Sequence, residues 1–341
     1  MVNVASIQAT DEGYRARAGA LTLLYLSSPL ERPVLRTLMA ELTTGVKMQE
    51  IGPPDPEFMR MGIFEDSYLL EPADPDHPPG EPIGPDTLLQ PTPAGKQVPF
   101  IGAVLADWLR RCPQGPLEHG PESGRHMAAL LGGWASMAIH ALAGGPRSAA
   151  QVCEAIQVLD REALDARIDS MLATGLLEQA PGEDPDGEPL VRATEWLRRA
   201  VAPLAAAARM EQRFPPGDTA PIAALDVEAA FQLTLPLLKL PRRFRGTCSL
   251  AVELEEGVAG SPAGVTARVE DGSVVACERG LDPDAQVAVS GDTGAWLDAV
   301  IDRRTEGISS SGERRLAKRI LRELHRTLFK GVPPLKIPRR R

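Results

Sequence analysis

The sequence predicts an α+β protein of three domains, with two helix-rich units in tandem followed by a smaller domain of strands and helices. Three observations lead to this prediction. A short segment recurs in the first two thirds of the chain, apolar residues around both copies follow a helical period, and beyond residue 221 the pattern changes to short alternating strands. We expect the domains to span residues 1–118, 119–214 and 215–341.

The internal repeat pairs residues 69–82, LLEPADPDHPPGEP, with residues 176–189, LLEQAPGEDPDGEP, and eight of the fourteen positions are identical. In each copy a helical stretch precedes the segment, and a short extended run and a Thr-led helix follow it. The same unit is therefore expected twice. The first copy is the degenerate one, since its third helix, at 57–66, is short and contains Gly62.

The second copy shows its elements more clearly. Ser148 and Gln151 have the spacing of a capping box that opens a helix. Gly175 follows an amphipathic stretch, as expected of a helix C-cap. The unit is therefore expected to run helix, helix, helix, hairpin, helix, at 126–143, 148–156, 160–174, 176–193 and 195–213. Such an order makes a winged helix-turn-helix domain.

The stretch LLGGWASMAIHALAGGPRSAAQVCEAI, followed by LDREALDARIDSMLATGLLEQ, resembles the HxlR-type bacterial transcriptional regulators over residues 125–214. The resemblance implies a winged helix whose helix at 160–174 enters the major groove of DNA. On that reading Arg161 and Arg167 contact DNA, and Arg147 and Ser148 contact phosphates at the start of the preceding helix. It also allows a homodimer through the helices at 98–111 and 195–213.

Acidic residues depart from that family pattern. The helix at 160–174 carries four carboxylates, and the loops at 74–81 and 182–187, where a wing would approach DNA, are acidic too. Carboxylates that face phosphates oppose binding. An alternative is therefore open, in which the winged helices form a scaffold and do not bind DNA.

The last domain reads as a short helix at 227–238, strands at 247–254, 264–269, 273–277 and 285–289, a helix at 293–302 and an amphipathic helix at 314–329. Asp271-Gly272 is a strong hairpin turn. The stretches GVTARVEDGSVVA and DPDAQVAVSGDTGAWLDAVIDRR resemble the sterol carrier protein domain over residues 225–330. That resemblance implies an apolar tunnel for a hydrophobic small molecule, with candidate lining residues Phe231, Leu235, Leu238, Trp296, Val300, Ile320 and Leu324. The alternative is that these side chains fill an ordinary core.

Charge and cysteine content exclude several classes of protein. The net charge of −9 divides into −8 for residues 1–124, −3 for 125–214 and +2 for 215–341, so bulk charge does not indicate a nucleic-acid-binding protein. Basic residues gather at 314–326 and at the C-terminus. They form a solvated face, contact phosphates or pair with the acidic first half of the chain. The four cysteines have no CxxC spacing and no histidine at ligand spacing, so they are expected to be reduced core residues and not metal ligands.

We find no catalytic motif, no cofactor-binding motif, no signal peptide and no membrane span in the sequence, which predicts a cytoplasmic protein that is not an enzyme. The leading hypothesis is a ligand-responsive transcriptional regulator, with winged helices on DNA and a hydrophobic effector in the last domain. The alternative is a protein that binds or sequesters a hydrophobic small molecule and never touches DNA.

Overall fold

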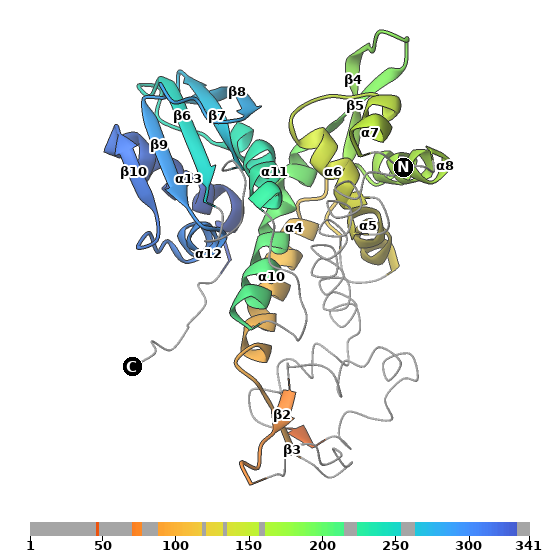
Figure 1. Ribbon diagram of the computed structural model, residues 1–341. Coiled ribbons are helices and arrows are strands. Elements are labelled where there is room, and N and C mark those ends of the chain that lie inside the picture. Colours follow the sequence, from red (N-terminus) through yellow and green to blue (C-terminus); the bar gives the residue numbers. More distant parts are fainter. Residues whose placement is uncertain are drawn as a thin grey trace, which may run out of the picture.

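The computed structural model describes residues 46–47, 70–76, 88–117, 121–131, 135–156, 161–214, 224–253 and 263–332. These residues form an α+β protein, as the sequence predicts (Figure 1). They contain three sheets: a three-stranded one in the first unit, a two-stranded one in the second and a five-stranded one in the C-terminal part. No helix in these ranges combines the length and apolar character needed to cross a membrane.

The first unit contains a small antiparallel sheet followed by a helix. β3 lies between β1 and β2, and a short 3-10 turn, η2, leads into helix α4. The hairpin and α4 lie where the sequence predicts them, whereas β1 is not predicted. The helix expected at 57–66, with Gly62, lies outside the described residues. The bounds are β1 Val46–Lys47, β2 Leu70–Pro72, β3 Leu88–Pro91, η2 Gly95–Gln97 and α4 Val98–Leu109.

The second unit has four helices, a hairpin and two further helices in line. The helix expected at 126–143 is two helices, and residues 132–134 between them lie outside the described ranges. The helix expected at 195–213 is divided at Ala200, because Pro203 has no N–H to bond to the carbonyl of Arg199. The bounds are α5 Pro121–Leu131, α6 Ala135–Ala143, α7 Ala149–Ile156, α8 Arg161–Ala173, β4 Leu177–Glu183, β5 Pro189–Ala193, α9 Glu195–Arg199 and α10 Val201–Arg213.

Local signals set the ends of α7 and α8. The capping box at α7 is confirmed, because Ser148 Oγ accepts the N–H of Gln151 and Gln151 Oε1 accepts the N–H of Ser148, both at 3.2 Å. Gly175 ends α8 with φ +72°, and the N–H of Leu176 returns to the carbonyl of Met171. The C-cap prediction is therefore confirmed too.

The hairpins of the two units contain the same turn. In each, the first Asp of an Asp-Pro-Asp triplet accepts the N–H of the second Asp at 2.9 Å, from Asp76 to Asp74 and from Asp186 to Asp184. A hairpin and then a helix follow one another in both units, and these helices, α4 and α10, pack together. The sequence repeat thus corresponds to a repeated structural element.

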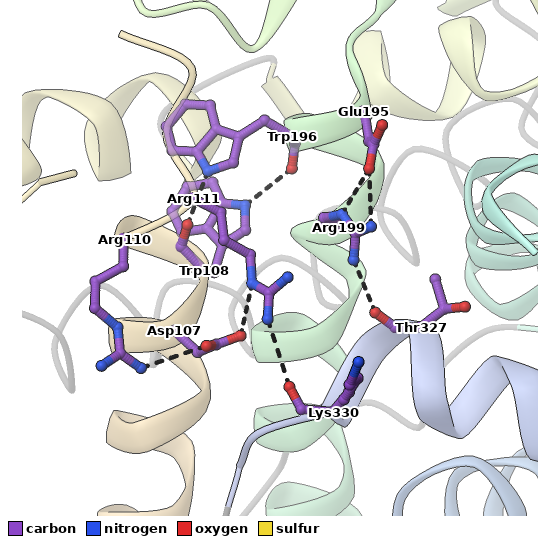
Figure 2. Close-up of polar contacts among 9 residues, drawn as sticks. All are labelled: Asp107, Trp108, Arg110, Arg111, Glu195, Trp196, Arg199, Thr327 and Lys330. Atoms are coloured by element: carbon purple, nitrogen blue, oxygen red, sulfur yellow. Dashed lines mark hydrogen bonds and ion pairs between the residues drawn. The ribbon is translucent and has the colours of Figure 1, made fainter. Parts of the chain in front are cut away.

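α4 and the α9–α10 pair run antiparallel, and two tryptophans join them (Figure 2). The ring of Trp108, at the end of α4, stacks on that of Trp196, at the start of α9, with centroids 4.4 Å apart. Each indole N–H donates to the backbone carbonyl of the other residue at 2.9 Å. The helices expected to mediate dimerisation therefore pack against each other within one chain.

The C-terminal part is a mixed sheet of order β10-β9-β6-β7-β8, in which β6 and β9 are parallel. α11 packs against β7 and β8, whereas α13 packs against β9 and β10, so the helices cover different ends of the sheet. The bounds are α11 Ala224–Thr234, η3 Leu235–Leu237, β6 Gly246–Val252, β7 Ala263–Glu270, β8 Ser273–Arg279, β9 Val287–Gly291, α12 Thr293–Leu297, η4 Asp298–Asp302, β10 Ser309–Gly312 and α13 Arg314–Phe329.

Three details of this part differ from the prediction or confirm it. The β7–β8 turn is confirmed at Asp271 and Gly272, whose φ values are +48° and +77°. The helix expected at 293–302 is α12 followed by a single π-helical turn, η4. Ser309–Gly312, which the sequence analysis leaves without structure, is the edge strand β10.

Arginines of α4 and α9 hold the C-terminal part against the second unit (Figure 2). Arg199 donates to the carbonyl of Thr327 at 3.0 Å and Arg111 to that of Lys330 at 3.4 Å, at the end of α13. Arg198 similarly bonds carbonyls at the end of α11. Cations at helix C-termini complement both the unpaired carbonyls and the helix dipole. The two parts are therefore joined through polar contacts that satisfy helix ends.

Candidate functional site

The candidate site is the surface formed by α7, α8 and the β4–β5 hairpin, where the sequence places Arg147, Ser148, Arg161 and Arg167. The structure brings Ser148 and Arg161 against the same loop, at Asp184 and Glu188. Neither acidic residue is assigned a role by the sequence analysis. No signal in the sequence places Glu188 against α7, because the contact depends on how the hairpin packs.

Ser148 holds the β4–β5 loop. Its side chain is buried, and its hydroxyl hydrogen-bonds to the carboxylate of Asp184. This bond is the main reason why the pKa of Asp184 lies below its ordinary value, and the backbone N–H groups of Glu188 and Asp186 act in the same direction. The hydroxyl that the resemblance assigns to a phosphate is therefore engaged within the chain.

Glu188 occupies the start of α7. Its Oε2 accepts the N–H of Ala150 at 3.2 Å, in the first turn of the helix. Unpaired N–H groups and the helix dipole make this the position where a helix binds an anion. In this structure the anion is a carboxylate of the same chain.

Arg161 at the start of α8 is paired twice. Its Nε lies 2.8 Å from Asp165 Oδ1 and its Nη2 lies 3.3 Å from Glu188 Oε2. The hydrogen bond from Arg161 to Asp165 is the largest cause that raises the pKa of the guanidinium. The side chains of all three residues are about half exposed, so the pairs are weak individually but neutralise the arginine.

Arg147 and Arg167 have different settings. The backbone of Arg147 exchanges two hydrogen bonds with Val191 of β5, at 3.0 and 2.9 Å, which fixes α7 to the hairpin. Its side chain lies on a shallow surface hollow beside Gln151 and Glu154. Arg167 is half-buried near the middle of α8.

The whole surface is acidic. Between residues 147 and 192 the chain has four arginines and ten aspartates and glutamates. Two of the arginines, Arg161 and Arg192, are paired with carboxylates of this same surface. The field outside α7 and α8 is therefore negative, which repels a phosphate backbone.

The seven candidate ligand-lining residues lie together in the core of the C-terminal part. All are buried, and Val300 is the most exposed at 9%. Phe231 and Trp296 meet edge to face with centroids 4.6 Å apart, and the Trp296 indole donates to the carbonyl of Ala251 at 2.9 Å. They come from α11, η3 and its C-cap, α12, η4 and α13, and they are Phe231, Leu235, Leu238, Trp296, Val300, Ile320 and Leu324.

The cysteines do not form a chemical site. All four are free, and burial raises the pKa of Cys248 and of Cys277 to about 12, which keeps these thiols protonated. Among the residues that the structure describes, no group of three His, Cys, Asp or Glu side chains is placed to hold a metal ion.

Comparison of the chain with family models, with curated proteins and with solved structures gives no match. The argument on function therefore depends on the geometry of the chain itself.

Proposed function

We propose that this chain is a binding protein in which the second unit is a winged helix used as a scaffold, and that the C-terminal part holds a hydrophobic small molecule. One observation carries the first half of the proposal: the hairpin carboxylates of Asp184 and Glu188 occupy the groups of α7 and α8 that would meet DNA. The second half is supported by the convergence of apolar side chains from several helices on one side of the sheet.

The geometry makes DNA reading by α8 unfavourable. A phosphate at the start of α7 has to displace Glu188 from the N–H of Ala150 and from Arg161 at once. The displaced carboxylate then lies next to the phosphate, and like charges in contact oppose each other. The polar contacts of α9 with α11 and α13 show what the second unit does instead: it positions the C-terminal part.

A second candidate, a DNA-binding regulator, is favoured by the order of elements. α7 and α8 are followed by an antiparallel hairpin and a helix, the order of a winged helix-turn-helix, and Arg147 and Arg167 lie on this surface. In this reading the hairpin has to move before DNA binds.

Duplex DNA binding by the variant Arg161→Gln/Arg167→Gln separates the two candidates. We expect its affinity for a labelled duplex, measured by fluorescence anisotropy, to equal that of the wild type. The matched variant Asp184→Asn/Glu188→Gln removes two carboxylates and tests the surface from the other side. A loss of tenfold or more in the arginine variant, with sequence preference in the wild type, would establish the regulator and refute the scaffold.

The ligand half of the proposal has its own measurement. We expect a fluorescent C16 fatty-acid analogue to bind the full chain saturably with a stoichiometry of one. The Val300→Trp variant adds bulk at the most exposed of the seven residues, and it is expected to weaken this binding. Absence of saturable binding by the wild type would refute the ligand half and leave the scaffold half standing.

A further inference from the structure

We infer that the exposed face of α13 is a binding surface for the phosphate backbone of duplex DNA, independent of sequence. This surface is separate from α7 and α8, and the inference does not depend on the proposed function. We call it the α13 ridge, and it consists of Arg314, Arg315, Lys318, Arg322 and Arg326.

The ridge has a single sign of charge. The apolar residues of α13 are buried against the sheet, and four of the five ridge residues are fully classed as exposed cations with no carboxylate partner among the described residues. The fifth, Arg326, has a side chain 58% exposed and lies 3.8 Å from Glu323. Glu323 is the one acidic residue of α13, and its side chain is only 4% exposed, so it adds no negative charge to the surface.

Glu323 also orders the ridge. Its Oε1 lies 2.9 Å from Arg319 Nη2, which is mostly covered, and 3.8 Å from Arg326 Nη1. A buried carboxylate between two arginines one turn apart fixes their direction, while the excess of cations remains toward solvent. The ridge is therefore a preformed row of charge and not a set of independent flexible side chains.

The spacing of the row suits a nucleic-acid backbone. Arg315, Lys318, Arg322 and Arg326 follow one another at intervals of three or four residues, so each turn of the helix presents one cation. The row is about 17 Å long at 1.5 Å per residue. A helix with its side chains is roughly 10–12 Å across, and the major groove of B-DNA is roughly 12 Å wide.

The chemistry of the ridge favours DNA over a membrane surface. Helices that lie on membranes bury an apolar face in the bilayer, and the apolar face of α13 is already used in the core. Four of the five ridge residues are arginines, which bind phosphate with two parallel hydrogen bonds. The groups that fix a base sequence, such as Asn or Gln on the ridge, are absent from these five positions, so the contact is expected to be independent of sequence.

The test is the salt dependence of duplex binding by the full chain. Four phosphate contacts predict a slope of about −3.6 for log K against log salt, which is a loss of affinity of about 150-fold between 50 and 200 mM salt. Lys318→Gln/Arg322→Gln removes two contacts and predicts a slope of about −1.8 and a loss of about 12-fold. Both positions are exposed, and glutamine is a good helix former, so the fold is expected to be retained.

The matched control is Arg242→Gln/Arg243→Gln. It removes the same charge from an exposed turn after η3, which lies at the β8 end of the sheet, whereas α13 lies at the β9–β10 end. The control is expected to keep the wild-type slope. The inference is overturned if the wild type does not bind duplex, if the two double variants have the same slope, or if the ridge binds vesicles of anionic lipid and not DNA. The proposed function is tested separately by Arg161 and Arg167, so the two failures are distinguishable.

Discussion

At the scale of single residues, Trp108 and Trp196 form the most specific contact between the first two units. Each indole satisfies a carbonyl of the other residue, and the two rings stack. Both side chains are almost fully buried. A buried carbonyl that loses its donor costs about 1–3 kcal/mol, and stacking of an aromatic pair adds about 0.5–1.5 kcal/mol.

We therefore expect Trp108→Phe and Trp196→Phe each to lower the free energy of unfolding by about 1–3 kcal/mol. The double variant should lose less than the sum, because the two residues share one contact. Urea unfolding of the four proteins measures this. Trp296→Phe is the control, since Trp296 bonds to Ala251 and contacts neither tryptophan, so its effect should add to that of Trp108→Phe. Additive losses for the Trp108–Trp196 pair would contradict the contact.

At the scale of elements, sequence reasoning succeeded where the signal is local. The capping box at Ser148, the C-cap at Gly175 and the turn at Asp271-Gly272 are each decided by a few neighbouring residues, and all three are confirmed. α13 has the predicted bounds, because its apolar period is unbroken over sixteen residues. Local chemistry of this kind is readable from the chain alone.

The elements that were missed depend on distant contacts. β10 is a run of serines that becomes a strand only because β9 offers it an edge, and the break at Ala200 follows from one proline in an otherwise helical stretch. The candidate site shows the same limit. Sequence could place Arg161 and Ser148 on the right helices but could not show that Glu188 and Asp184 reach them.

The β4–β5 hairpin gives a prediction with a definite sign in pH. The pKa of Asp184 lies below its ordinary value of 3.8, chiefly because of the hydrogen bond from Ser148. A lowered pKa means that the carboxylate stabilises the folded hairpin fully above pH 3.8 and that this contribution is lost as pH falls through the lower, folded value. In NMR titrations the amide shifts of Asp186 and Glu188 should therefore report a transition below pH 3.8.

The Asp184→Asn variant is the control for this titration. It should remove the transition at both amides, since they donate to Asp184 Oδ1 at 2.9 and 2.8 Å. A wild-type transition at or above pH 3.8 would show that the carboxylate is not held by Ser148. It would also weaken the argument that the hairpin occupies the start of α7.

At the scale of the whole molecule, a second set of ions joins α10 to the C-terminal part. Arg209 is 3% exposed, and its Nη2 lies 2.7 Å from Asp302 Oδ2, while Arg213 pairs with Asp298 and Asp302. The π-helical turn η4 places these two aspartates at its ends. Removal from water lowers the pKa of Arg209 to about 10, which still leaves it charged at neutral pH.

Arg209→Met leaves the half-buried Asp302 with Arg213 alone, so it should destabilise the protein by about 3 kcal/mol, the lower end for breaking a buried pair. Arg213→Met removes a more exposed cation and should cost less than half as much. In Arg209→Met/Asp302→Leu the uncompensated aspartate is gone, so much of the loss should be recovered. Urea unfolding of the three variants decides this. Because the pair crosses the boundary between α10 and η4, a recovered double variant would show that the ions orient the C-terminal part and contribute little net stability. Failure of the double variant to recover would show that Asp302 has a role beyond the pair.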